Sequence, residues 1–573
     1  MPALDLAALH ATRDVDLTVW PPRYDPAYRP PPDEACWLPE VECAEPAARD
    51  TLVLAKLRRQ VRYAWEKSAF YPRTWEAAGV SPETLRSLED LARFPVVQKQ
   101  DLRAAQATAP PFGDYLCIEP AAVARIHGTS GTTGRPTVFG IGAEDWERIA
   151  AAHARILWGA GIRPGDRILI CPFFSLYLGS WGALAGGERL GATVFPFGAG
   201  AQGQTLQAVH WARDLRPSAF YGTPSYALHF AETARREGID PAGLGFRVLF
   251  FSGEPGAGIP ATRALIERTF GGTCVDMGSM AEMSPWMTNG ECAHRTGMHL
   301  WQDLVYTQVC DPETFRPLPY GAEGTPVYTH LERTSQPMIR LVSGDRARWV
   351  DEPCPCGRTY PRLPRGLYGR FDDMIIVRGE NVYPCAIEDT LRAIDGFGGE
   401  FRVIVSRREA MDELLVRAEY TAGHRDRLDA LRTLMRERLR ARLGVHPVVD
   451  LVPAGTLPRT EFKVRRVIDD RDLYRQALHR SRAPRTPGKT HEKLARPPAR
   501  DPGQFVRMSA KGAKEPSRNP VRLTRSPGTR SGAAGMSAKG AKEPSRHPVY
   551  STFKRAERKA RHVRRRRDQA SDR

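Results

Sequence analysis

Short apolar runs that alternate with helical or glycine-rich stretches constrain the fold of this chain more than any other feature. Residues 167–171, 192–197, 219–221 and 246–251 are rich in strand-forming side chains, and helical or glycine-rich connections separate them. Strands joined in this way fold as a parallel sheet with helices on its faces. The sequence therefore predicts an α/β domain.

A second pattern begins after residue 370. Residues 401–406 and 413–420 are typical of a strand pair, residues 425–443 of an amphipathic helix, and residues 448–452 of a further strand. This order predicts a separate, smaller α+β domain. Near the other end, residues 50–68 have apolar side chains at helical spacing, and Asp50 is expected to be the N-cap of that helix.

The basic charge of the chain is confined to its C-terminal end. Of 84 Lys and Arg against 66 Asp and Glu, 26 basic and 7 acidic residues lie after residue 480, which leaves 58 basic and 59 acidic residues before it. This end is rich in Pro and Ser and repeats the string MSAKGAKEPSR, so we expect a disordered tail. Its four arginines at 564–567 can attract phosphates. The tail lacks interleaved aromatic residues, however, so we expect no nucleic-acid partner.

Four regions follow from these patterns. They are a Pro-rich N-terminal extension at residues 1–45, expected to wrap over the surface, a large domain at 46–370, a small domain at 371–480, and the basic tail at 481–573.

Several classes of protein are excluded by composition. No run approaches the roughly 18 apolar residues of a membrane-spanning helix, so no membrane partner is expected. The N-terminus lacks the apolar stretch of a secretory signal. Ten cysteines in 573 residues are too few for a disulfide scaffold, so we expect a cytoplasmic protein.

The string HGTSGTTGRP at residues 127–136 is the strongest local signal. Gly permits close approach of the backbone, and hydroxyl and N–H groups donate hydrogen bonds to phosphate oxygens. The string is not a Walker A loop, because no Gly-Lys-Ser/Thr follows it. Its alternative is an ordinary polar turn. For His127 itself, a packing role is the simpler interpretation, beside a contact with substrate or nucleotide.

This string resembles the phosphate loop of the adenylate-forming superfamily, which includes acyl-CoA synthetases, adenylation domains and luciferases. Thr137-Val138 stands where Lys-Gly is usual, and this variant resembles the phenylacetate–CoA ligase branch, which includes coenzyme F390 synthetase-like proteins. Further motifs follow in the family's order: SGEP at 252–255, DMGSMAE at 276–282, GD at 344–345, GRFDDMI at 369–375, GENVYP at 379–384 and LPRTEFK at 457–463. The resemblance implies a large multi-sheet adenylate-forming domain with a small mobile C-terminal lid.

The resemblance also implies a reaction and its residues. A carboxylic acid would react with ATP to give acyl-AMP and pyrophosphate, and the thiol of coenzyme A would then displace AMP. The resemblance implies that the β- and γ-phosphates are bound by Thr129, Ser130, Gly131, Thr132, Thr133 and Gly134, and that the adenine is bordered by the turn of Ser252, Gly253, Glu254 and Pro255. Glu282 would bind Mg²⁺, Asp345 would bind the ribose, and Arg370 would lie near the ribose and α-phosphate. Asp372 would be the hinge of the small domain, with Asp373 as the alternative, and Lys463 would bridge the carboxylate and the α-phosphate.

The chain departs from the family at two places. The family usually has an aromatic residue for adenine and a Thr or Ser before the glutamate, and here Met277 or Gly278 takes the first place and Ala281 the second. Phe462 replaces the usual Gly before Lys463. These departures weaken the expected adenine stacking and permit reduced activity.

Cysteine and histidine residues suggest a second metal. Cys354 and Cys356 together with Cys292 and His299 have the ligand types of a tetrahedral structural Zn²⁺ site, and some members of the resembled branch carry such a site. His294 competes with His299 for the fourth position, and free thiols are the alternative.

Aromatic residues follow the strand at 167–171. Ligands of α/β folds sit at the carboxyl ends of strands, so Tyr177 and Trp181 are candidates for an acyl pocket, with core packing as the alternative. A pocket of this kind favours an aromatic or other bulky apolar acid.

The functional hypothesis is an AMP-forming acid–thiol ligase whose partners are a small carboxylic acid, ATP and coenzyme A. One alternative is an adenylating enzyme that passes the acyl or AMP group to a carrier protein or a deazaflavin cofactor. Another is a catalytically degenerate nucleotide-binding scaffold. The sequence leaves a homodimer open.

Overall fold

The computed structural model describes residues 15–17, 19–129, 136–176, 178–198, 203–285, 287–371, 374–378, 380–408, 411–458 and 466–471. The chain divides into a compact unit, Met1–Arg485, and a second unit, Thr486–Arg573. The second unit and the whole of the expected basic tail at 481–573 lie outside the described residues.

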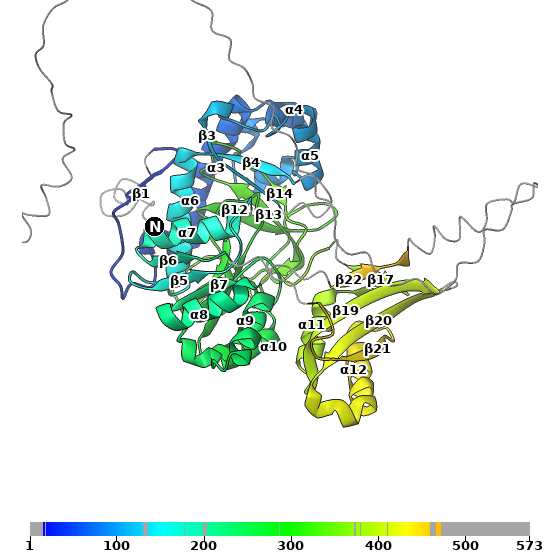
Figure 1. Cartoon of the computed structure of the whole chain (residues 1–573). Coiled ribbons are helices and arrows are strands. Elements are labelled where there is room, and N and C mark those ends of the chain that lie inside the picture. The colour runs from blue at the N-terminus through cyan, green and yellow to red at the C-terminus, as the bar shows by residue number, and fades with distance from the viewer. Residues whose placement is uncertain are drawn as a thin grey trace, which may run out of the picture. The chain divides into compact units, whose positions relative to one another are not determined.

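An eight-stranded sheet forms the centre of the large domain (Figure 1), in the order β16-β11-β10-β9-β8-β7-β5-β6. Its strands are β5 (Arg167–Ile170), β6 (Thr193–Pro196), β7 (Ala219–Gly222), β8 (Val248–Phe251), β9 (Thr273–Gly278), β10 (Asn289–Glu291), β11 (Met298–Leu300) and β16 (Arg362–Leu363). The strands from β6 to β9 pair in parallel, and β10, β11 and β16 continue the sheet in antiparallel pairs. The four strands expected from the sequence are β5 to β8, so the α/β prediction is confirmed.

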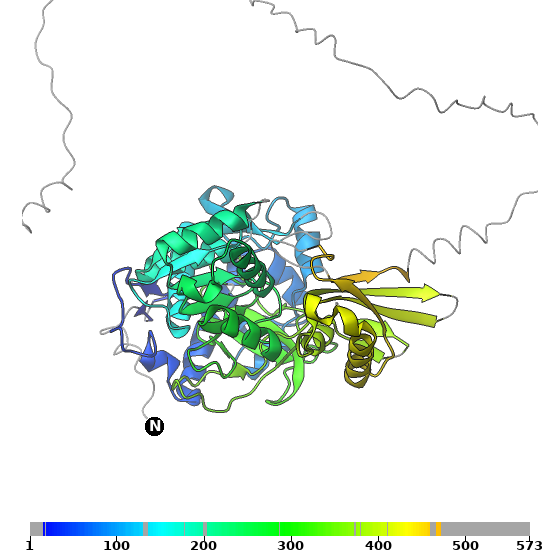
Figure 2. The same ribbon diagram turned by 60° about the horizontal axis from the view of Figure 1, so that its bottom comes forward.

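Helices cover both faces of this sheet (Figures 1 and 2). They are α6 (Ala143–Gly159), α7 (Leu178–Leu190), α8 (Gln204–Leu215), α9 (Pro224–Arg236) and α10 (Pro260–Phe270). Side chains of a strand point alternately to opposite faces. Ile168 and Ile170 accordingly pack into the core under α6 and α7, whereas Leu169 packs into a second core under α8, α9 and α10.

A second group of elements in the large domain lies outside the eight-stranded sheet. It comprises α3 (Pro46–Lys67), α4 (Phe70–Ala77), α5 (Lys99–Thr108), the ribbon of β3 (Val123–Gly128) and β4 (Val138–Gly142), and the sheet of β12 (Val305–Cys310), β13 (Glu323–His330), β14 (Leu341–Val342) and β15 (Ala347–Arg348). Short 3-10 helices occur at Pro82–Thr84, Glu89–Arg93, Pro120–Ala122, Pro241–Leu244 and Ala422–Arg427.

The expected N-cap at Asp50 is wrong. Helix α3 begins at Pro46, and Glu45 has the extended backbone of the cap residue. Pro is favoured at the first helical position because it has no N–H to leave unpaired and its φ already suits a helix. Asp50 therefore lies one turn inside the helix.

The Pro-rich N-terminal segment does more than wrap over the surface. Its described part contains β1 (Val15–Asp16), β2 (Arg23–Tyr24) and α2 (Pro39–Glu42). Trp37 is fully buried and packs edge-on against Trp158 of α6, with ring centroids 5.6 Å apart. The expectation of a surface segment is corrected here, because this segment supplies part of the main core.

A cluster of buried charges ties this segment to the large domain. The guanidinium of Arg155 contacts Glu42 at 2.9 Å and Asp303 at 2.7 Å, and Arg358 contacts Glu42 at 2.7 Å. All four side chains are at most 3% exposed. These cations hold the pKa of Glu42 and of Asp303 below the ordinary range, although burial alone would raise both values. Removing one partner of such a cluster leaves an uncompensated buried charge.

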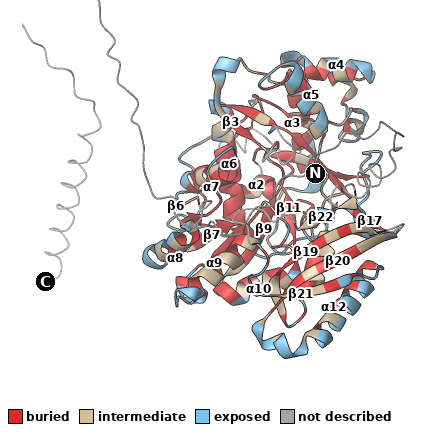
Figure 3. Cartoon of the chain, turned by 45° about the vertical axis from the view of Figure 1, so that its right-hand side comes forward, coloured by how far each residue is buried: buried red, intermediate tan, exposed pale blue. Residues whose placement is uncertain are grey.

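The small domain is α+β, as expected. Its elements are β17 (Ile375–Val377), β18 (Glu380–Val382), α11 (Pro384–Arg392), β19 (Phe397–Arg408), β20 (Met411–Tyr420), α12 (Leu428–Leu443), β21 (Val448–Pro453) and β22 (Val467–Asp469). Its four-stranded sheet has the order β21-β20-β19-β22 and shares a core with α11 and α12. Much of the outer face of α12 is exposed (Figure 3). Within the described residues, no helix is long and apolar enough to cross a membrane.

Candidate active site and metal centre

The stem of the expected phosphate loop is the β3–β4 ribbon. At its end the N–H of Thr129 donates to the carbonyl of Thr137 at 2.9 Å, and the N–H of Thr137 donates to the hydroxyl of Thr129 at 3.2 Å. A Cβ on Gly128 would lie 2.8 Å from the Thr137 carbonyl oxygen, so this position requires glycine. Thr129 therefore closes the stem. The remaining loop residues, Ser130 to Gly134, lie outside the described residues.

The expected adenine-site turn follows β8 at the carboxyl edge of the parallel strands. The hydroxyl of Ser252 and the phenol of Tyr221 are hydrogen-bonded at 2.7 Å, and Gly253 has a φ of +93°. Glu254 accepts the N–H of Ser225 at 2.8 Å at the start of α9, and burial raises the pKa of Glu254. Pro255 is exposed. Ser252 to Pro255 thus form a turn directly after β8.

Glu282 follows β9 and is a buried carboxylate with few contacts. It is 4% exposed, and neither of its oxygens has a hydrogen-bond partner among the described residues. The nearest cation is the ammonium of Lys99, 3.6 Å from Oε1. A buried carboxylate without hydrogen bonds is costly. Such an oxygen donor suits a hard divalent cation, so the residue fits the expected Mg²⁺.

Asp345 and Arg370, expected beside the ribose, lie together. The guanidinium of Arg370 contacts Oδ1 of Asp345 at 3.2 Å, and the two residues form an isolated antiparallel bridge. Gly344 makes this turn with a φ of +74°, and its carbonyl accepts the N–H of Phe371. The structure therefore brings together two residues that are 25 positions apart in the sequence.

Trp181, expected in the acyl pocket, lies in a cluster of aromatic side chains. Its indole N–H donates to the carbonyl of Ser175 at 2.9 Å, and its ring meets Phe174 edge-on at 5.0 Å. His127 meets the same indole at 6.4 Å and stacks on Trp146 at 5.6 Å. Trp146 carries no signal in the sequence, because only the fold brings it to this place.

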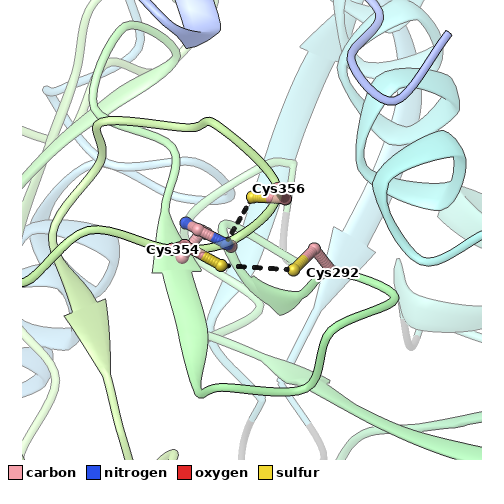
Figure 4. A group of neighbouring side chains, drawn as sticks. Cys292, Cys354 and Cys356 are labelled. Atoms are coloured by element: carbon pink, nitrogen blue, oxygen red, sulfur yellow. Dashed lines mark hydrogen bonds between the residues drawn. The ribbon is translucent and has the colours of Figure 1, made fainter.

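The predicted zinc ligands form a cluster (Figure 4). One ligand atom from each of Cys292, His299, Cys354 and Cys356 lies within 4.8 Å of all the others. The two measured separations are 3.7 Å between the sulfurs of Cys292 and Cys354, and 3.5 Å between Sγ of Cys356 and Nε2 of His299. His294 is exposed, so it is not the fourth member.

These separations are those of a tetrahedral zinc site. Zn–S and Zn–N bonds of about 2.3 Å and 2.0–2.1 Å place two sulfurs about 3.8 Å apart and a sulfur and nitrogen about 3.6 Å apart. The chemistry of three thiolates and one imidazole therefore fits a structural zinc ion. Arg358 follows the cluster directly and binds the buried Glu42, which fixes the loop to the core.

Comparison with known proteins agrees with this geometry. The family described as "AMP-binding enzyme C-terminal domain" matches residues 379–471. The phenylacetate-coenzyme A ligase of Thermus thermophilus is 35% identical over 453 residues, which are 76% of this chain and 99% of that protein. The ligase of the same name from Escherichia coli is 35% identical over 76% of this chain and 98% of its own length. The chain belongs to the phenylacetate–CoA ligase branch of the adenylate-forming enzymes.

Solved structures support the same assignment. A 2-hydroxyisobutyryl-CoA ligase in the postadenylation state, in complex with 2-HIB-AMP, is 51% identical, has a TM-score of 0.78, and matches 81% of this chain and 99% of its own. The same ligase with 2-HIB-AMP and CoA in the thioesterification state is 52% identical with a TM-score of 0.63, over 82% of this chain and 99% of its own.

Asp372, Lys463 and Tyr177 lie outside the described residues, as do Ser130 to Gly134 of the phosphate loop. The described site residues are Thr129, Ser252 to Pro255, Glu282, Asp345, Arg370 and Trp181.

The departure of this chain from the branch in the DMGSMAE segment now has a structural description. Met277 is 2% exposed and belongs to the core between the sheet, α6 and α7. Gly278 ends β9, and a Cβ built on it meets no atom within 4 Å. Gly278 is therefore the residue that faces open space, and no aromatic side chain stands there.

Substituting Gly278 with Tyr is expected to strengthen ATP binding. A Cβ at this position meets no atom within 4 Å, and stacking of a base on an aromatic ring contributes about 1–3 kcal/mol, so the KM for ATP should fall about fivefold or more. The measurement is the KM for ATP in acid-dependent pyrophosphate exchange. Gly278→Ala is the matched control, because it adds a Cβ without a ring and should leave the KM unchanged. A folded Gly278→Tyr protein with an unchanged or higher KM would contradict this account.

Proposed function

We propose that the protein is an AMP-forming ligase that joins a carboxylic acid to coenzyme A. In the first step a carboxylate oxygen bonds to the α-phosphorus of ATP, and the bond from that phosphorus to the bridging oxygen breaks, which releases pyrophosphate. In the second step the thiol sulfur of coenzyme A bonds to the acyl carbon. The bond from that carbon to the AMP oxygen breaks, and the thiol proton is lost.

The observation that carries the proposal is the state of Glu282. In a chain of this family, the residue at the metal-binding motif position is a buried carboxylate without hydrogen bonds among the described residues. Because the attacking carboxylate and the triphosphate are both anions, the reaction requires positive charge and accurate placement. A magnesium ion held by Glu282 would supply charge that offsets the phosphate oxygens.

The other residues have supporting roles. Asp345 would accept hydrogen bonds from the ribose hydroxyls, and the guanidinium of Arg370 would hold its carboxylate in place. The loop that begins at Thr129 would hold the β- and γ-phosphates, and Ser252 to Pro255 would border the adenine. Lys463 would bridge the acid carboxylate and the α-phosphate, and Asp372 would be the hinge of the small domain.

Two classes of acid are supported. The aromatic side chains around Trp181 and the phenylacetate ligases among the relatives favour an aryl acid such as phenylacetate. The higher identity of 51% to a 2-hydroxyisobutyryl-CoA ligase favours a short branched acid with a 2-hydroxyl group. The two classes share a carboxylate with a bulky substituent on the next carbon.

The experiment that tests the function is ATP–pyrophosphate exchange with a panel of aryl, alkyl and 2-hydroxy acids, followed by measurement of CoA-dependent AMP release. We expect exchange that depends on the acid, and AMP release that depends on coenzyme A. Exchange without any dependence on coenzyme A would favour another acceptor, such as a carrier protein or a deazaflavin. Binding of ATP without exchange for any acid would favour a degenerate scaffold.

Substituting Lys463 with Ala is expected to slow this exchange by about 100-fold or more, because it removes the positive charge beside the developing acyl phosphate. The melting temperature should stay unchanged, and Lys489→Ala in the expected tail is the matched control. An Lys463→Ala protein that retains full exchange would contradict the role given to this residue.

The protein's further partners follow from the same proposal. We propose a structural zinc ion at Cys292, His299, Cys354 and Cys356. All ten cysteines are unpaired, which supports a reducing compartment such as the cytoplasm. The expected partners are small molecules, and the absence of a nucleic-acid partner stays a prediction.

A further inference from the structure

His127 is a buried polar residue to which the proposed mechanism gives no role. It lies in β3, next to the glycine that ends this strand, and is 3% exposed. By distance and angle, neither of its ring nitrogens makes a hydrogen bond among the described residues, although the backbone of Leu176 lies close enough to interact with the imidazole. Buried polar groups are nearly always hydrogen-bonded, so two unpartnered nitrogens indicate that another group completes the site.

The surroundings of His127 on the described side are aromatic. Its ring stacks on Trp146 at 5.6 Å with an interplanar angle of 11°, and meets Trp181 at 6.4 Å with an angle of 64°. Arg125 lies on the same face of the strand, with its guanidinium 4.0 Å from the centre of Trp146. These two indoles offer no hydrogen-bond acceptor to the imidazole.

The imidazole is neutral at physiological pH. Burial lowers the pKa of His127 to about 4, and the positive charge of Arg125 acts in the same direction. A hydrogen-bonding interaction of the imidazole with the backbone of Leu176, whose carbonyl also accepts the N–H of Gly128 at 2.9 Å, opposes this shift only in part. A neutral imidazole has one N–H donor and one acceptor nitrogen. A hydroxyl group both donates and accepts hydrogen bonds, so it can pair with either nitrogen of the imidazole.

The position of His127 places the imidazole, and the hydroxyl group that it needs as a partner, next to the expected reacting groups. The chain passes from His127 through Gly128 to Thr129, which closes the stem of the phosphate loop. On the other side, Trp181 belongs to the helix that follows β5, at the carboxyl edge of the parallel strands, where α/β folds bind their ligands. An acid bound here for attack on ATP would have its carboxylate toward the ATP, and a group on C2 is only one carbon from that carboxylate.

We infer that His127 determines specificity by hydrogen bonding to a hydroxyl group on C2 of the acid. This inference rests on the proposed ligase function and makes its substrate a 2-hydroxy acid, held by the carboxylate at one end and by the imidazole at the hydroxyl. The walls formed by Trp146 and Trp181 would take the apolar substituents on the same carbon. The residue is therefore part of the acyl site, which the sequence alone does not reveal.

The test compares acids that differ only in the hydroxyl. One pair is 2-hydroxyisobutyrate and pivalate, in which a methyl group replaces the hydroxyl, and the other is mandelate and phenylacetate. The measurement is kcat/KM for acid-dependent pyrophosphate exchange. In the wild type we expect the hydroxy acid of the accepted size to be preferred by about 10- to 100-fold, because the other acid leaves the buried imidazole unpaired.

The His127→Leu substitution should bring this preference close to one, mainly by lowering the rate with the hydroxy acid. His127→Gln keeps a donor and an acceptor and should retain part of the preference. His210→Leu, at a partly exposed histidine of α8, is the matched control and should leave the preference unchanged.

Equal rates with both acids of a pair in the wild type would overturn the inference and leave the ligase function standing. The same holds for a preference that survives in His127→Leu, or for a His127→Leu protein that loses only thermal stability. If the His127→Leu protein does not fold, the inference is tested by the ratio of kcat/KM for the two acids in the wild type and in His127→Gln. Absence of exchange with every acid would overturn the ligase function itself, and the inference with it.

Discussion

Replacing Glu282 with Gln is expected to slow acid-dependent pyrophosphate exchange by about 100- to 1000-fold, the usual cost of removing one well-placed electrostatic group from an active site. The amide has nearly the shape of the carboxylate but lacks the charge that binds Mg²⁺. The fold should be retained, and the melting temperature should stay equal or rise, because the substitution removes a buried charge that has no hydrogen bond among the described residues. The measurement is the exchange rate as a function of Mg²⁺ concentration.

Lys99 supplies the control for this experiment. Its ammonium is 3.6 Å from Glu282, and its side chain is 35% exposed. If Glu282 acted only through this ion pair, Lys99→Met would reproduce the loss. We expect instead that Lys99→Met retains most of the activity, because a partly exposed ion pair contributes at most about 1 kcal/mol. Full activity of Glu282→Gln at saturating Mg²⁺ would contradict the metal-binding role.

The second large effect is expected at the cysteine cluster. The purified protein should contain about one zinc per chain, and Cys354→Ser should lose the metal together with more than about 3 kcal/mol of stability, because a structural metal contributes directly to folding. The measurements are the metal content by mass spectrometry and the melting temperature. Strong chelators should destabilise the wild type in the same way.

Cys385→Ser is the matched control, since Cys385 is a half-buried thiol outside the cluster. It should leave both the zinc content and the melting temperature unchanged. A folded wild type without zinc would show that the four side chains are free thiols and a histidine, which was the alternative at the level of sequence. Zinc that remains bound in Cys354→Ser would remove Cys354 from the ligand set.

The strands were predictable because their signal is local. Successive side chains in the runs at 167–171 and 246–251 point alternately into two cores, one on each face of the sheet. Every residue of β5 and β8 is therefore apolar, apart from Arg167 at the start of β5. A strand buried on both faces has this composition whatever its neighbours are. The order of the strands and the three antiparallel additions depend on contacts between distant segments, and no local pattern reports them.

The N-terminal segment shows the opposite case. Its prolines argue against regular structure, and most of the residues that the structure describes in this segment lie outside helices and strands. The role of Glu42 depends on Arg155 and Arg358, which are 113 and 316 positions away. A single acidic residue among prolines is ordinarily a solvated charge, so only the fold reveals that it is buried.

The site divides in the same way. The motif order predicts Glu282, Asp345 and Arg370 as site residues, and the structure places Asp345 beside Arg370. The four candidate zinc ligands were predicted from residue type, and the structure brings them together, with buried His299 in the group and His294 exposed. The contact of His127 with Trp146 could not be predicted from the sequence, because it joins a strand to a helix through packing alone.

The buried charge cluster has a practical consequence for anyone who shortens this protein. A version that starts at residue 46 would discard Glu42 and keep Arg155 and Arg358, two guanidinium groups that share it as a counter-ion. Such a version would also expose the surface that Trp37 covers. The stretch that carries Trp37 and Glu42 is thus part of the folded large domain, and expression designs need to retain it.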